Sequence, residues 1–211
     1  MTSPAPADPH APPSSRTAGR DVALVAVFAA LLTVLALVPA VPVGSAGVPI
    51  TLQSLGVLLA GLVLGPWRGV AAVAVYVALG LSGLPVFAGG VAGLGVLVGP
   101  TAGYVLAWLP ATFVTGLGAA LVLRRSRGRL PGLIAAGAVG GVAITYLGGW
   151  IGLQVNLGLG PGAAFVGGVL PYLPGDGLKL VVAAFVAASV HRAFPDVLAR
   201  RTPGTLGAEA S

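Results

Sequence analysis

The stretch DVALVAVFAALLTVLALV, residues 21–38, decides the fold, because every residue after Asp21 is apolar except one threonine. A helix that crosses a bilayer needs about 17–25 residues of this kind. Pro39 and Pro42 follow directly and end the helix, since proline has no N–H and clashes with the preceding turn. The stretch therefore predicts a membrane helix over 21–38. A cleaved signal peptide is the rival interpretation, but the apolar part of such a peptide has only about 7–15 residues.

Composition extends this conclusion to the whole chain. Of 211 residues, 56% are hydrophobic and 8% are charged, whereas soluble domains contain about 25% charged residues. The sequence therefore predicts a protein of the lipid bilayer, placed in the cell membrane. The net charge of +6 lies in tails and short connections, which argues against a nucleic-acid surface. Because cysteine is absent, disulfides, thiolate metal sites and a thiol nucleophile are excluded.

The apolar part of the chain, from Val22 to Phe194, has room for about six spanning helices, so the predicted fold class is an all-α membrane protein. Residues 1–20 and 195–211 are predicted to be disordered tails around one membrane domain, 21–194. Two of the helices are shorter than a normal span, and a re-entrant hairpin there would reduce the count from six to four. After 21–38, the predicted helices occupy 52–64, 69–81, 101–123, 131–154 and 175–193, with a short helix over 163–172.

Basic residues alternate from one connection to the next, which predicts the orientation. Lys and Arg concentrate on the cytoplasmic side of membrane proteins. The loops after the first, third and fifth long helices contain no Lys or Arg, so they are predicted to lie together on the outer face. Six helices with both termini in the cytoplasm satisfy this alternation. The basic positions are Arg16, Arg20, Arg68, Arg124, Arg125, Arg127, Arg129, Arg192, Arg200 and Arg201.

The segment LPYLPGDGLKL, residues 170–180, contains Asp176 and Lys179, the two Asp, Glu, Lys or Arg residues between Arg129 and Arg192. A spacing of three places both side chains on one face of a helix. Ionisable groups inside a membrane are costly and usually face the bundle interior or a wet cavity. We interpret the pair as part of a ligand site near the outer face. An internal ion pair that ties helices together and a proton or ion relay are the alternatives.

Other candidates are less distinctive. Gln53 is a polar residue at the start of a helix, where its amide needs partners, and Thr51 before it is either a helix cap or a ligand contact. Phe87 and Tyr104 flank a glycine-rich segment and are candidate pocket walls. Enzyme signatures such as G-x-S-x-G and H-E-x-x-H are absent, and so is the ATP-binding motif G-x-x-x-x-G-K-[ST]. No catalytic residue, metal site or cofactor is predicted.

Four motifs together resemble the BioY family, the biotin-binding S components of energy-coupling factor (ECF) transporters. In order they are PITLQSLGVLLAGLVLGPWRG at 49–69, LPVFAGG at 84–90, GLGVLVGPTAGY at 93–104 and LPYLPGDGLK at 170–179. The resemblance covers about residues 22–192. It implies the S-component fold of six membrane helices, a biotin pocket near the outer face, uptake of biotin as the transported substrate, and no catalysis.

The resemblance also implies partners and residue roles. The partners are a transmembrane coupling protein and a pair of ATP-hydrolysing subunits, although some members of the family occur without a dedicated set. The G-D-x-x-K motif matches Asp176 and Lys179, which implies ligand contacts. The small-residue spacing of Ala26 and Ala30 on the first helix resembles the surface that meets the coupling protein. Val91 stands where relatives can have a polar residue, which leaves the contribution of that loop to binding open. An S component for another small vitamin, or an intramembrane enzyme that uses Asp176 and Lys179, is the alternative function.

Overall fold

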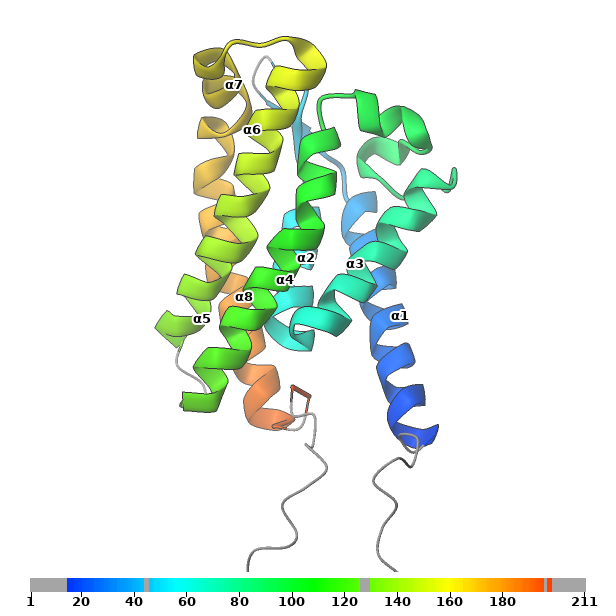
Figure 1. Cartoon of the computed structure of the whole chain (residues 1–211), viewed down its shortest axis with the longest axis vertical. Helices are drawn as coiled ribbons and strands as arrows, with labels where there is room; N and C mark the ends of the chain where they lie inside the picture. Colours follow the sequence, from blue (N-terminus) through cyan, green and yellow to red (C-terminus); the bar gives the residue numbers. More distant parts are fainter. Residues whose placement is uncertain (1–14, 44–45, 126–129, 196, 199–211) are drawn as a thin grey trace, which may run out of the picture.

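The computed structural model describes residues 15–43, 46–125, 130–195 and 197–198. Its regular structure is helical apart from two strands of two residues each (Figure 1). Four helical stretches are long and apolar enough to cross a membrane, namely Ala18–Leu37, Ala102–Arg124, Leu130–Leu157 and Pro161–Ala193. The helices are α1 (Ser15–Leu37), α2 (Gln53–Leu64), α3 (Pro66–Leu81), α4 (Ala102–Arg125), α5 (Leu130–Ala136), α6 (Ile144–Leu157), α7 (Pro161–Gly168) and α8 (Leu173–Ala193).

The predicted helices are all present, with shifted ends. α1 begins at Ser15, six residues before the predicted start at Asp21, so residues 15–20 are helical rather than part of a tail. The reason is that extending an existing helix is far less costly than nucleating one, and no proline interrupts this stretch. α3 begins at Pro66 instead of Gly69, because proline fits the first turn of a helix, where its missing N–H has no role.

The predicted helix over 131–154 contains a feature that the sequence did not reveal. Between α5 and α6 the chain forms a π-helical segment, Gly137–Ala143. The helix therefore continues without a break, but the register of its backbone hydrogen bonds shifts. The glycines of this segment allow very close packing. A Cβ added to Gly140 would lie 2.3 Å from the backbone nitrogen of Thr115, on α4. The π segment therefore lies directly against α4.

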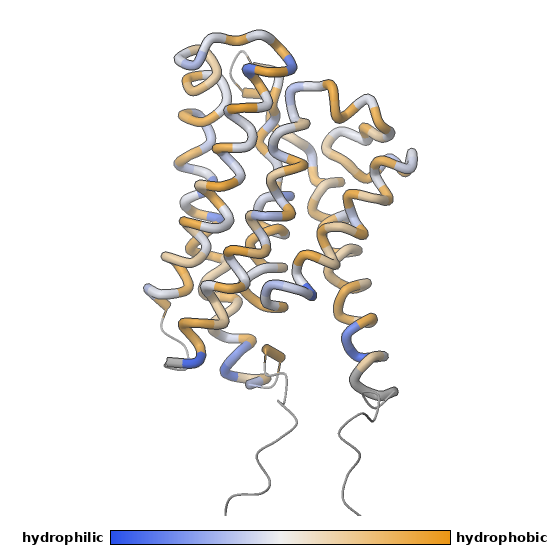
Figure 2. The backbone as a smooth tube through the Cα atoms, in the orientation of Figure 1, coloured by the Kyte–Doolittle hydropathy of each residue, from blue (hydrophilic) through white to orange (hydrophobic). Residues whose placement is uncertain are grey.

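Helix α4 is the centre of the bundle, and it packs against α2, α3, α6 and the π segment. α2 is almost wholly enclosed, since every residue from Gly56 to Leu64 is buried. Figure 2 shows hydrophobic residues along the sides of the long helices and hydrophilic residues at the lower ends of α1, α4 and α8. This distribution is the one expected of a bundle whose outer surface faces lipid.

The start of α1, the end of α4 and the end of α8 lie at the same, lower end of the bundle (Figure 1). There Arg68, which follows the α2–α3 turn, donates a hydrogen bond of 3.2 Å to Asp21 of α1. It also donates to the carbonyl oxygen of Val197. Val197 is buried in the core cluster, so the chain just after α8 packs against the bundle, although the sequence placed it in a disordered tail. The physical reason is that a buried guanidinium needs acceptors, and this backbone supplies one.

At the opposite end, two connections build the frame of a cavity. Val41–Pro42 (β1) pairs antiparallel with Pro49–Ile50 (β2) as a small hairpin before α2. The glycine-rich connection between α3 and α4 folds into two 3₁₀ turns, Ala88–Gly90 and Leu94–Val98. The strands were missed because two residues are too few to show an alternating pattern.

Candidate functional site

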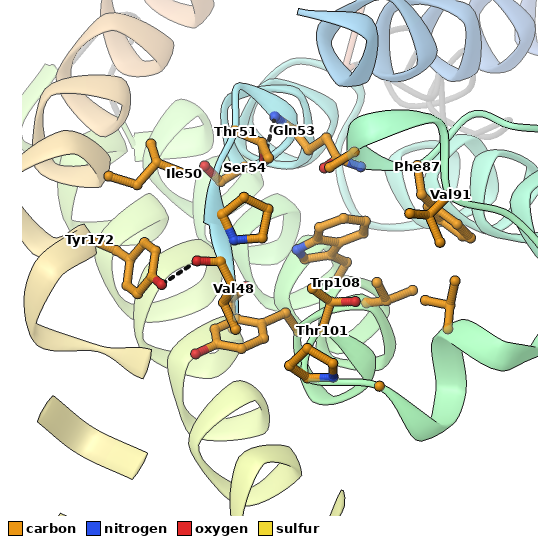
Figure 3. A pocket seen from close by; sticks show the side chains of 18 of the residues that line it. Val48, Ile50, Thr51, Gln53, Ser54, Phe87, Val91, Thr101, Trp108 and Tyr172 are labelled. Atoms are coloured by element: carbon orange, nitrogen blue, oxygen red, sulfur yellow. Dashed lines mark hydrogen bonds between the residues drawn. The ribbon is translucent and has the colours of Figure 1, made fainter. Parts of the chain in front are cut away.

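A cavity of about 470 Å³ lies at this end of the bundle. Its size is within the range of about 300–1,000 Å³ that is typical of small-molecule sites. The β1–β2 hairpin, the α3–α4 connection and the adjoining parts of α2, α4, α6 and α8 all contribute to its wall (Figure 3). Most lining residues are apolar or aromatic. The polar ones include Thr51, Gln53, Ser54, Thr101, Tyr104, Trp108, Thr145, Tyr146, Tyr172, Asp176 and Lys179.

Asp176 and Lys179 form the charged part of this wall. Both lie in the first turns of α8, and Nζ of Lys179 is 2.7 Å from Oδ1 of Asp176. The Lys179 side chain is 11% exposed and that of Asp176 is 14% exposed. The start of a helix also favours an anionic side chain such as Asp176. The two predicted site residues are therefore a nearly buried ion pair that also faces the cavity.

Two residues from other helices complete the shell of Asp176. Ser54 of α2 donates a hydrogen bond of 2.9 Å to Oδ1 of Asp176 and accepts one of 3.0 Å from Nζ of Lys179. Tyr146 of α6 donates a bond of 2.7 Å to Oδ2 of Asp176. The acidic side chain thus links α2, α6 and α8 in one network.

The network leaves the two charged groups unequally available to a ligand. Lys179 donates to the carbonyl oxygen of Thr51 at 2.6 Å, to Ser54 and to Asp176, so all three of its N–H groups are occupied. A carboxylate has about four acceptor positions. Oδ2 of Asp176 accepts one hydrogen bond within the described residues, so it retains capacity for a donor from a ligand.

Gln53 connects the wall of the cavity to α3 through a hydrogen bond. It is 4% exposed, and its Nε2 donates to the hydroxyl of Tyr76, which in turn donates to the carbonyl oxygen of Val86 at 2.8 Å. The hydroxyl of Thr51 accepts the backbone N–H of Gln53 at 3.3 Å, although the helix cap itself is Leu52. The structure therefore gives Thr51 a local structural bond as well as a place on the cavity wall.

Phe87 and Tyr104 both line the cavity, as does Val91. Phe87 packs edge-on against Tyr76, with ring centroids 5.6 Å apart. Tyr104 donates a hydrogen bond of 2.6 Å to the carbonyl oxygen of Gly168, which joins α4 to α7. The structure thus brings all five predicted pocket residues to one cavity, including Gln53, Asp176 and Lys179.

Sequence reasoning missed Ser54, Trp108, Tyr146 and Tyr172. Tyr172 donates to the carbonyl oxygen of Val48, which fastens the β1–β2 hairpin over the cavity (Figure 3). One signal was available, because the chain has only four tyrosines, and three of them line this cavity. Ser54 gave no such signal, since a serine in the first turn of a helix is common.

The other two predicted residues lie elsewhere. Ala26 and Ala30 are exposed on α1, and neither lines the cavity. Val22, Val27 and Val34 of the same helix are also exposed, which makes this an apolar outer face. Within the described part of the chain, no group of three or more His, Cys, Asp or Glu residues is placed to hold a metal ion.

Comparison with known proteins assigns this architecture. A biotin transporter BioY from Rhodobacter capsulatus is 48% identical over 193 residues, which cover 86% of this chain and 98% of the relative. A biotin transporter BioY from Rhizobium etli is 40% identical over 184 residues, with the same coverage of 86% and 98%.

A solved structure shows the same fold. The S-component for biotin from an ECF-type ABC transporter superimposes with a TM-score of 0.81 at 26% identity, over 86% of this chain and 95% of that one. Among models of protein families, that of the BioY family matches residues 10–196. By sequence and by fold, the chain belongs to the BioY family.

Proposed function

We propose that this protein captures biotin at the outer face of the cell membrane and delivers it to the cytoplasm as the S component of an ECF-type transporter. The observation that carries the proposal is the cavity of about 470 Å³, whose charged wall is the Asp176–Lys179 pair of a BioY-family chain. The relatives named as biotin transporters and the S-component for biotin support the choice of ligand.

The chemistry of biotin suits this cavity. Biotin combines an apolar thioether ring, a ureido group with two N–H donors and one carbonyl, and a carboxylate. Phe87 and Tyr104 offer apolar surface to the ring system, and Gln53 offers an amide. Oδ2 of Asp176 has acceptor capacity, so we place one ureido N–H against it. The carboxylate of biotin does not suit this wall, because all three donors of Lys179 are occupied and Asp176 would repel it.

The test is calorimetric titration of detergent-purified protein with biotin, dethiobiotin and thiamine. Tight binding of biotin, weaker binding of dethiobiotin and no binding of thiamine are expected. Dethiobiotin retains the ureido ring but lacks the thioether, so it reports on the apolar part of the cavity. If the folded protein does not bind biotin, or binds thiamine more tightly than biotin, the assignment is refuted.

For the membrane topology we propose six crossings with both termini in the cytoplasm. The four long apolar stretches account for four crossings. α2 and α3, with 12 and 16 residues, extend about 18 and 24 Å and supply the other two. The described basic residues Arg20, Arg68, Arg124 and Arg192 belong to the helix ends and turns that this topology places inside. Residues 21–194 form the membrane domain in this proposal.

The proposed partners are a transmembrane coupling protein and two ATP-hydrolysing subunits. Partners are needed for active uptake because the chain has no ATP-binding motif. We assign the docking surface to α1 around Ala26 and Ala30, which are exposed. Small side chains allow a second helix to approach closely within the membrane.

A further inference from the structure

We propose that Gln53 Oε1, on α2, and Trp108 Nε1–H, on α4, form a second ureido subsite in addition to Asp176. The inference rests on the proposed function, because it takes biotin as the ligand. In this arrangement the second ureido N–H donates to Oε1 of Gln53, and the ureido carbonyl accepts from Nε1 of Trp108. The first ureido N–H remains with Asp176.

The hydrogen bonds around Gln53 fix which end of its amide faces the ligand. Tyr76 has a single hydroxyl proton, and it donates that proton to the carbonyl oxygen of Val86 at 2.8 Å. Towards Gln53 the hydroxyl can therefore only accept, so it must meet the NH₂ of the amide. Oε1 of Gln53 then has no protein partner among the described residues, and the side chain lines the cavity.

Trp108 supplies the complementary group. It is 7% exposed, lines the cavity, and its indole N–H has no hydrogen-bond partner in the described chain. The polar side-chain atoms that are both sealed and unpaired there are the hydroxyls of Thr112, Thr115 and Thr145. The indole N–H is not among them, and the Trp108 side chain lines the cavity. Figure 3 shows the indole with its nitrogen edge turned toward the interior.

Both side chains neighbour Tyr76. Gln53 donates to the hydroxyl of Tyr76, and the ring of Trp108 lies 6.2 Å from that of Tyr76, centroid to centroid. Tyr76 is thus a common neighbour of the side chain that offers the acceptor and the side chain that offers the donor. This pairing complements an N–H and C=O on neighbouring atoms, as in a urea.

Most other donors of the cavity are already used within the protein. The hydroxyls of Tyr104, Tyr146 and Tyr172 donate to Gly168, Asp176 and Val48, respectively. Lys179 is fully occupied as well. The indole N–H of Trp108 is therefore available without breaking a protein hydrogen bond, and a ligand that lacks an acceptor there would leave it unpaired.

The test replaces Trp108 with phenylalanine, which keeps an aromatic ring but removes the N–H. The expected loss of biotin affinity is about tenfold, the value of one good hydrogen bond. The same loss is expected with dethiobiotin, which has the same ureido ring. In 2-iminobiotin the ureido carbonyl is replaced by a guanidinium that is protonated at neutral pH and cannot accept a hydrogen bond, so at that pH Trp108→Phe should weaken its binding less than twofold. Trp67→Phe is the control, because Trp67 is exposed and does not line the cavity.

A second variant tests the acceptor. Gln53→Met has a similar length but removes Oε1, together with the Nε2 donor to Tyr76, and should weaken biotin at least about tenfold. The matched control is Gln154→Met, since Gln154 donates to the carbonyl of Trp150 and lies outside the cavity. Melting temperatures show whether each variant folds.

Each outcome has a defined meaning. Unchanged biotin affinity in folded Trp108→Phe, or an equal loss with 2-iminobiotin, would overturn the subsite and leave the proposed function intact. Wild-type protein that fails to bind biotin would overturn the proposed function, and the subsite with it.

Discussion

Ser54 and Asp176 lie 122 residues apart in the chain and are joined by a hydrogen bond of 2.9 Å. The same hydroxyl accepts from Lys179 at 3.0 Å, so it stands between the two charges of the ion pair. Serine on α2 therefore fixes the geometry of a pair that belongs to α8. The network orients Asp176 before any ligand arrives, and such preorganisation lowers the entropic cost of binding.

Asp176→Asn should weaken biotin binding by at least about 100-fold. The substitution replaces one acceptor oxygen of the carboxylate with an NH₂ donor. It also leaves the nearly buried ammonium of Lys179 without its counter-charge, a change that typically costs about 3–5 kcal/mol of stability. Calorimetric titration with biotin measures the effect, and the melting temperature separates lost binding from lost folding. Wild-type affinity in the folded variant would show that Asp176 is no ligand contact.

Ser54→Ala should reduce biotin affinity about five- to tenfold, because it removes one hydrogen bond to each member of the pair. Ser189→Ala is the matched control. Ser189 is exposed on the same helix as Asp176, and its hydroxyl donates only to the carbonyl of Phe185. If both serine variants bind alike, the contribution of Ser54 to the site is disproved.

Gly140→Ala should lower the free energy of unfolding by about 3 kcal/mol or more, or prevent folding. Its Cβ would lie 2.3 Å from the backbone nitrogen of Thr115, which cannot move aside as a flexible side chain can. Gly162→Ala, in α7, is the control, because an added Cβ there meets nothing within 4 Å. Thermal melts in detergent compare the two. An equally stable Gly140→Ala protein would contradict the close α4 contact.

Ala30→Trp should abolish assembly with the coupling protein but leave biotin affinity within twofold of wild type. A bulky side chain prevents close approach of a partner helix to the exposed face of α1, and Ala30 does not line the cavity. Val182→Trp, at an exposed position of α8, controls for bulk on the outside of the bundle. Co-purification of the complex and biotin titration are the two readouts. Intact assembly of Ala30→Trp would exclude this docking face.

Single cysteines should report the topology without background, because the natural chain has none. Ala163→Cys, exposed on α7, should react in intact cells with a maleimide that cannot cross membranes. Arg124→Cys, at the end of α4, should react only after the cells are opened. The reverse pattern would invert the proposed orientation, and equal labelling of both sites would contradict an odd number of crossings between them.

The sequence predicted every long helix, because hydropathy and proline positions act locally. The apolar run before Pro39 identified α1, and the spacing of Asp176 and Lys179 predicted that they share a helix face. The π segment at Gly137–Ala143 could not be predicted in this way. Its register depends on how closely α4 approaches at Gly140, which is a tertiary contact.

For the candidate site, too, the sequence determined some features and the tertiary structure decided the others. Sequence alone determined that this is an apolar bundle with one acid and one base on the same face of its last helix, since both properties are set by side-chain chemistry and short-range spacing. Only the tertiary structure decided that Ser54 and Tyr146 hold Asp176, that all three donors of Lys179 are occupied, and that Trp108 faces the cavity. These groups meet because α4 and α6 pack at almost backbone contact, where a Cβ on Gly103 would lie 2.1 Å from the carbonyl oxygen of Gly148. Such convergence depends on the distance between helices, which no local pattern of residues encodes.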